Sequence, residues 1–93
     1  MPTVGIVNLH IREDFAPLML VMSGPAKNRP IRSLAEIADA LLAAWPTDDG
    51  EEYIAAVQAC LDAIQGNIPA KAARAALIRA AEEAEISLIA VVH

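Results

Sequence analysis

The stretch SLAEIADALLAAWPTDDGEEY, residues 33–53, decides the fold. Ser33 and Glu36 have the spacing of a capping box, in which the Ser hydroxyl accepts from the third helical amide and the Glu reaches back to the cap amide. Apolar residues then recur at helical spacing until Trp45, and Pro46 ends the run. The apolar stripe consists of Leu34, Ile37, Ala38, Leu41, Leu42 and Trp45. We therefore predict a first helix that begins after Ser33 and ends at Trp45.

The acidic end of this stretch predicts the start of a second helix. Thr47 is the expected N-cap, and the acidic residues after it lie in the first turn. Negative charge at a helix N-terminus is stabilising by about 0.3–1 kcal/mol per exposed residue. The acids do not have the alternating spacing of a calcium loop. The pattern therefore favours capping, and we expect no metal site.

Two further helices and a final strand follow. The second helix is expected to bury one face and to end at Gly66, a C′ residue; that face consists of Tyr53, Ile54, Val57, Cys60, Leu61 and Ile64. The third helix is expected to start at Pro69. Its buried stripe consists of Ala73, Leu77, Ala80, Ala81 and Ala84. Residues 87–92 (SLIAVV) have the composition of a strand.

Strands are also expected before the first helix. Residues 17–23 alternate as a strand does, and the chain turns and returns over residues 29–32. Pro30 cannot donate to a ladder, so the return strand is expected at a sheet edge. Residues 3–11 are a candidate extra N-terminal strand. The fold class is therefore α+β, in the order β-β-α-α-α-β, with three helices packed on one face of a small hairpin-based sheet.

The composition predicts one domain with a thin core. The chain has 93 residues, of which 20 are Ala, and only 3% are aromatic. We expect a single domain over residues 1–93, with residues 1–14 as a strand or an extension. Each Ala buries little area, so apolar burial at about 25 cal/mol per Å² leaves a small margin over chain entropy. Self-association is expected to supply additional burial of apolar surface and so additional stability.

The charge is distributed unevenly. The net charge is −5, and no Lys or Arg occurs from Leu34 to Ala70. This region contains the acids Glu36, Asp39, Asp48, Asp49, Glu51, Glu52 and Asp62. Such a surface disfavours nucleic acid, because affinity for nucleic acid comes largely from neutralising phosphates. The apolar run over residues 15–22 is too short to span a bilayer, so neither nucleic acid nor a membrane is expected as a partner.

Four features are candidate functional positions, each with a structural alternative. Trp45 either anchors the junction of the first two helices or stacks on a ligand. Arg74 lies at the border of the third helix's stripe, where it either bridges to an acid or stacks on Trp45, or else binds an anion. Three basic residues lie on the hairpin, namely Lys27, Arg29 and Arg32. They either protect the edge strand from aggregation or form a docking site for an acidic surface. The single cysteine, Cys60, is expected to be a buried structural thiol and indicates a cytoplasmic protein.

The order of these residues resembles a known family. The motif consists of Trp45, Pro46, Cys60, Gly66, Ala73, Arg74, Ala80, Ala81 and Ala84. In this order and spacing, over roughly residues 15–86, the chain resembles the bacterial domain-of-unknown-function family 982. The resemblance implies a small mixed α/β domain and no established activity. Leu77 departs from the family, which usually has Phe there.

These features together favour a non-enzymatic interaction or regulatory module that forms a homodimer through an edge strand, helix faces or both. No Ser/His/Asp or Cys/His pairing, phosphate-binding Gly loop or metal-ligand spacing is found in the sequence, and no cofactor is expected. The alternative is a small-ligand or anion-binding protein, or a small enzyme, with a pocket near Arg74 and Trp45.

Overall fold

The computed structural model describes residues 15–21 and 28–90. Its elements, in chain order, are β1 (Leu18–Val21), β2 (Asn28–Ile31), α2 (Leu34–Asp39), the π-helix η1 (Ala40–Ala44), α3 (Glu51–Ile64), α4 (Ala70–Glu83) and β3 (Ser87–Ala90). This is the predicted α+β order, with the first helix divided into α2 and η1. The candidate strand over residues 3–11 and the side chain of Lys27 lie outside the described residues.

The three strands form an antiparallel sheet in the order β2-β1-β3. Met19, at the centre, is opposite Pro30 on one side and Ile89 on the other. Leu18, Leu20 and Ile31 are buried against the helices, as the alternation of a strand with one covered face requires. The predicted edge position of the strand that contains Pro30 is confirmed.

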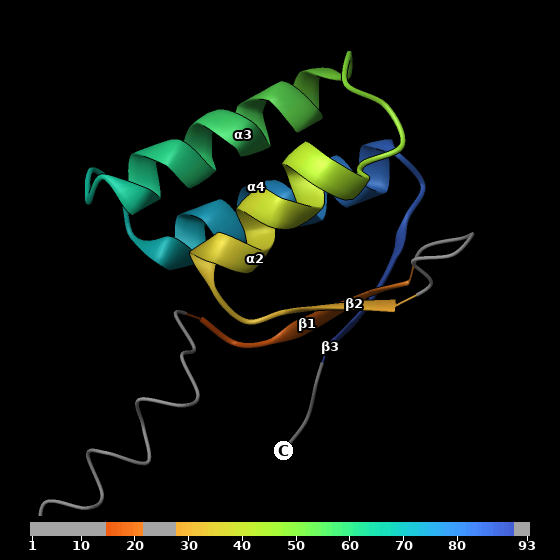
Figure 1. Ribbon diagram of the computed structural model, residues 1–93, viewed down its shortest axis with the longest axis horizontal. Coiled ribbons are helices and arrows are strands. Elements are labelled where there is room, and N and C mark those ends of the chain that lie inside the picture. Colours follow the sequence, from red (N-terminus) through yellow and green to blue (C-terminus); the bar gives the residue numbers. More distant parts are fainter. Residues whose placement is uncertain (1–14, 22–27, 91–93) are drawn as a thin grey trace, which may run out of the picture.

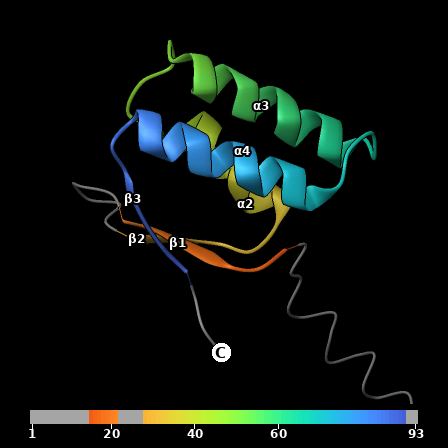
Figure 2. The same ribbon diagram turned by 180° about the vertical axis from the view of Figure 1, so that it is seen from behind.

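The helices all lie on one side of this sheet, but in two layers. In Figure 1 the sheet is at the bottom, α2 and α4 lie above it, and α3 is farthest away. The view from behind shows the same arrangement (Figure 2), with α3 antiparallel to α4. α3 therefore packs on α4 and α2, and among the described residues no helix covers its outer side.

The first helix begins as predicted and changes geometry before its end. Ser33 Oγ accepts a hydrogen bond of 3.3 Å from the Glu36 amide. The Glu36 carboxylate accepts from the amide of Arg32, at 2.5 Å, one residue ahead of the expected cap amide. The π-helix η1 was not predicted. Trp45 then adopts the extended conformation (φ −72°, ψ 139°) that a following proline imposes.

The starts of the other two helices differ from the prediction by one to three residues. The N-cap of α3 is Gly50, not Thr47, because a carboxylate from another helix caps it, as described below. Pro69 is the N-cap of α4 and not its first residue. Its ψ of 154° is extended, so its ring precedes the helix and the helical hydrogen bonds begin beyond it.

Both long helices end in the same hydrogen-bond motif. After α3, Gly66 has a φ of +84° and the Asn67 amide donates to the Asp62 carbonyl at 2.8 Å. After α4, Glu85 has a φ of +61° and the Ile86 amide donates to the Ala81 carbonyl at 2.8 Å. These are Schellman motifs. The predicted role of Gly66 is confirmed, whereas Glu85 occupies a left-handed position that favours glycine.

The core is formed by small residues and a few large ones. Its buried members are Leu18, Leu20, Ile31, Ile37, Ala40, Leu41, Ala56, Cys60, Ala63, Ala73, Ala76, Leu77, Ala80 and Ala81. On α4, the predicted stripe is buried except for Ala84, which is half-buried. Leu77 is fully buried, so the residue that departs from the family's usual Phe fills part of the core.

The predicted buried face of α3 is wrong for three of its six residues; Cys60 is buried as predicted, and Tyr53 and Val57 are half-buried against the core. Ile54, Leu61 and Ile64 are 48%, 51% and 53% exposed, and the residues that α3 buries are Ala56, Cys60 and Ala63. Alanines allow α3 and α4 to approach closely, and α4 presents alanines in return. Close Ala-on-Ala packing thus turns the large apolar side chains of α3 away from the core.

Candidate functional site

Arg74 is held by the main chain near the start of the sheet. Its Nε donates to the carbonyl oxygen of Ala16 at 2.8 Å, which ties α4 to the residues leading into β1. The predicted partners, an acid of the Lys-free region or the ring of Trp45, are replaced by this carbonyl. The guanidinium of Arg74 therefore fastens two segments that are 58 residues apart in the sequence.

Trp45 lies at the junction of η1 and α3. Its ring is 6.3 Å from that of Tyr53, centroid to centroid, at 34°, which is a favourable separation for an aromatic pair. The Tyr53 hydroxyl donates to the Leu41 carbonyl at 2.8 Å. This hydrogen bond attaches the first turn of α3 to the π-helix.

The structure does not bring Trp45 and Arg74 together. The aromatic pair is beside the C-terminal end of α4, because the Tyr53 amide also donates to Glu83. Arg74 precedes Glu83 by nine residues of α4, a rise of about 13 Å. An open hollow of about 330 Å³ lies beside Trp45, Tyr53 and Thr47, and Arg74 does not line it.

The acidic start of α3 is capped by α4. The Glu83 carboxylate accepts hydrogen bonds of 3.2 Å from the amides of both Glu52 and Tyr53. A Cβ on Gly50 would overlap the Glu83 carboxylate, so glycine at this position makes room for the cap. Arg79 of α4 forms a 3.6 Å ion pair with Glu52. The acidic segment is thus a helix start, as predicted, but the capping group comes from elsewhere in the chain.

The two described basic residues of the hairpin, Arg29 and Arg32, are paired with acids of α2. Arg29 forms a 2.5 Å ion pair with Asp39, and Arg32 forms a 3.4 Å pair with Glu36. Within residues 15–21 and 28–90, Arg29 Nε is the only buried side-chain N or O atom that has no hydrogen-bond partner. These pairs offset the positive charges of Arg29 and Arg32.

Cys60 is buried between α3 and α2. It is 2% exposed, and its Sγ donates to the Leu34 carbonyl at 3.5 Å. Burial raises the pKa of the Cys60 thiol, because a thiolate is poorly solvated there. A raised pKa is the opposite of what a nucleophilic cysteine needs.

An apolar face on α3 and η1 is the surface feature that the sequence reasoning missed. Of the five exposed large apolar side chains in the described residues, four lie here; these are Leu42, Ile54, Leu61 and Ile64. Leu42 is the most exposed, at 69%. The signal for this face was present in α3, where Ala56, Ala59 and Ala63 recur at helical spacing beside the larger residues. The following helix, α4, also has alanines at helical spacing. Together these two patterns predict that α3 and α4 pack closely through their alanine faces.

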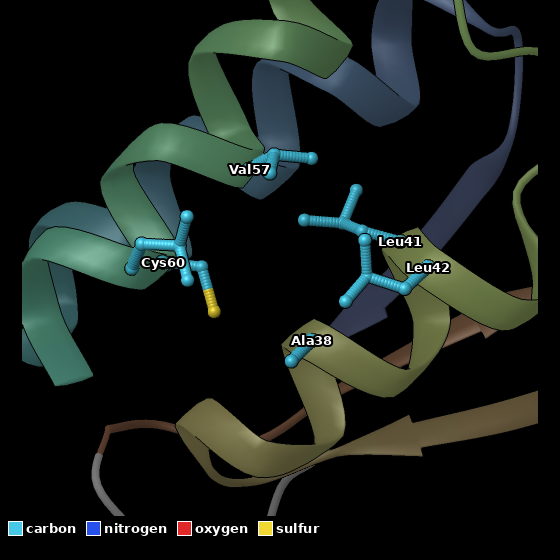
Figure 3. Close-up of a pocket in the computed structure, with 6 residues that line it drawn as sticks. Ala38, Leu41, Leu42, Val57 and Cys60 are labelled. Atoms are coloured by element: carbon cyan, nitrogen blue, oxygen red, sulfur yellow. The ribbon is translucent and has the colours of Figure 1, made fainter.

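A groove runs beneath this apolar face. Figure 3 shows Val57 and Cys60 of α3 pointing toward Ala38, Leu41 and Leu42 across a gap between the helices. Leu61 completes the lining, which has no polar surface. The space within this open groove is about 20 Å³, close to the size of one methyl group.

The described residues contain no cluster of three or more His, Cys, Asp or Glu side chains that is suited to a metal ion. None of the helices formed by these residues is both long and apolar enough to cross a bilayer. The class of protein that this geometry defines is a small α+β domain with an exposed apolar groove.

The comparison with known families agrees with the resemblance noted in the sequence. The family described as "Protein of unknown function (DUF982)" matches residues 16–88. The chain therefore belongs to this family. No curated protein and no solved structure matches the chain.

Proposed function

We propose that this protein is a non-enzymatic interaction module whose docking surface is the α3 face, defined as Leu42, Ile54, Val57, Leu61 and Ile64. One observation carries the proposal: α3 buries alanines and exposes its isoleucines and leucines. Burial of one large apolar side chain is worth about 1.5–3 kcal/mol. Single exposed apolar residues are ordinary, but a contiguous group over a groove is typical of an interface.

The polar side chains support a structural role over a catalytic one. Arg29 and Arg32 are bound to acids of α2, and Arg74 is bound to a main-chain carbonyl. Glu83 is bound to two amides of α3. A pocket between Arg74 and Trp45, the alternative site, has less support because these residues lie toward different ends of α4. We also propose a cytoplasmic location, which the free thiol of Cys60 favours.

The proposal includes a homodimer, joined along β3. Within the described sheet, β2 and β3 are the edges, and β2 is protected by Pro30 and the charged Arg29. The described side chains of β3 are uncharged, and Ile89 is 55% exposed beside Met19. A second β3 in antiparallel orientation would extend the sheet to six strands with no like charges opposed.

Light scattering on the wild type and two variants tests the dimer. Ile89→Lys is expected to give a monomer, because it places two lysines near the dimer axis. Ile54→Lys is the matched control, with a similar exposed isoleucine on the α3 face, and is expected to remain dimeric. A wild type that is monomeric at all concentrations would overturn the dimer.

Peptide selection tests the docking surface. Binders from a random peptide library are expected to be amphipathic helices that lose affinity for Leu61→Lys and retain it for Ile89→Lys. Binders that converge on another surface, or that ignore the substitution at Leu61, would refute the α3 face as the docking site.

A further inference from the structure

The α3 face has the dimensions of a binding site for one short helix. Its members on α3 are Ile54, Val57, Leu61 and Ile64, at spacings i, i+3, i+7 and i+10. The row extends over about 15 Å, since each helical residue rises 1.5 Å. Leu42 of η1 forms the opposite side of the groove. A helix of about three turns, with anchors three and four residues apart, matches this length.

The groove between the two sides accepts apolar side chains only. All six residues that line it are apolar or, for Cys60, an uncharged thiol already bound to the Leu34 carbonyl. The gap visible between Val57 and Leu41 in Figure 3 has room for a methyl group and little more. The centre of the bound helix must therefore present an apolar side chain such as leucine, of which one terminal methyl group enters the gap while the rest lies against the α3 face.

The border of the face is acidic. Glu51 and Asp62 are exposed and lie within about 80° of Ile54 around α3, at about 100° per residue. Gln58 and Gln65 lie between them and the apolar row. No Lys or Arg occurs between Leu34 and Ala70 to offset these acids within the segment. A second copy docked face to face would oppose acids to acids, whereas a basic segment would meet its complement.

We propose that the α3 face binds an amphipathic helix of another protein that has leucines on one side and lysines or arginines along their flanks. This inference rests on the proposed function and names the partner of its docking surface. The leucines lie on the α3 face, with one terminal methyl group in the groove between α3 and η1, and the basic flank lies along Glu51 and Asp62. Opposite charge raises the association rate and selects among partners that have the same apolar pattern.

Two synthetic helical peptides with the same leucine pattern test this inference, one with lysine flanks and one with glutamate flanks. Isothermal titration calorimetry on the full chain is expected to show the lysine peptide binding about tenfold tighter at low salt. Added salt is expected to narrow this difference, because exposed charges are screened.

Two variants separate the apolar contribution from the charged one. The double variant Glu51→Gln/Asp62→Asn is expected to remove most of the preference for lysine while leaving leucine-dependent binding. Leu61→Lys is expected to abolish binding of both peptides, with circular dichroism confirming that it remains folded. Chemical-shift changes on adding the lysine peptide are expected at Leu42, Val57 and Leu61.

Three outcomes would overturn the inference, and they differ in what they leave of the proposed function. If both peptides bind with equal affinity and both lose affinity for Leu61→Lys, the α3 face remains the docking surface but a basic partner is rejected. No binding of either peptide would reject this helix class altogether. A dimer that is disrupted by Leu61→Lys and that competes with the peptides would identify a second copy as the occupant.

Discussion

The Cys60 thiol has a predictable effect on stability at alkaline pH. Its folded-state pKa is raised by burial, so the folded protein retains this proton at a pH where the unfolded chain loses it. The stabilising contribution is complete below the ordinary thiol pKa of about 8.5 and is lost as pH rises toward the folded value. Below about pH 8 the thiol is protonated in both the folded and the unfolded state, so its contribution to stability no longer changes with pH.

Urea unfolding of the wild type and of Cys60→Ala from neutral pH to about pH 10 measures this effect. The wild type is expected to lose stability relative to the variant above pH ~8.5, by at most about 1.4 kcal/mol per pH unit. Parallel pH profiles for the two proteins would contradict the burial of the thiol. Slow reaction with a thiol reagent under native conditions is the accompanying expectation.

Most single residues whose partners are local have the role that the sequence predicts, although Pro69 precedes its helix instead of beginning it. Ser33, Pro46 and Gly66 act within three or four positions of themselves, and each has the role that its spacing predicts. Glu83 and Arg74 act on segments 30 or more positions away. Sequence spacing contains no information on such distant partners, so their roles became apparent only in the fold.

At the scale of elements, the capping of α3 by α4 depends on the Glu83 carboxylate and on Gly50. Glu83→Ala is expected to destabilise the protein by about 1–2 kcal/mol, because two helix-end amides lose their acceptor. Gly50→Ala is expected to cost a similar ~1–2 kcal/mol, because its methyl group displaces the carboxylate. Gly50 has a φ of −77°, which alanine adopts without strain.

A double-mutant cycle tests this arrangement by chemical denaturation. Once Glu83 is alanine, Gly50→Ala is expected to be neutral or slightly stabilising, which gives a coupling of about 1 kcal/mol or more. Glu82→Ala is the matched control on the same helix and is expected to change stability by less than about 0.5 kcal/mol. Additive effects of the two substitutions would contradict the proposed capping.

The helices were predictable as elements, but the burial of α3 was not. Apolar residues of α3 cover more than half of its circumference, so the sequence offers two candidate faces, one of alanines and one of larger residues. Hydrophobicity alone favours the larger face. The structure buries the alanines, because a partner helix that is itself rich in alanine packs closest against small side chains.

At the scale of the whole molecule, substitution by alanine is expected to destabilise the protein strongly at Leu77 and hardly at all at Leu42. Leu77 is fully buried under the sheet and helices, so Leu77→Ala is expected to cost about 2–5 kcal/mol. Leu42 is 69% exposed, so Leu42→Ala is expected to change stability by less than about 0.5 kcal/mol. Thermal unfolding monitored by circular dichroism measures the loss of stability in each of the two variants.

The comparison of Leu42→Ala with Leu77→Ala also separates effects on stability from effects on binding. Leu42→Ala is expected to weaken binding of the lysine-flanked peptide while the protein remains as stable as the wild type. A large loss of stability in Leu42→Ala would mean that this side chain belongs to the core, contrary to its exposure.

The sequence by itself determined the order of strands and helices, the helix ends at Trp45 and Gly66, and the edge position of the strand with Pro30. These features follow from local rules: periodicity, capping and the missing amide of proline act within a few residues. Only the tertiary structure decided which face of α3 is buried, which group caps it and that Trp45 and Arg74 are apart. Those outcomes depend on close contact between segments distant in the chain, where side-chain size and position, rather than hydrophobicity alone, select the packing.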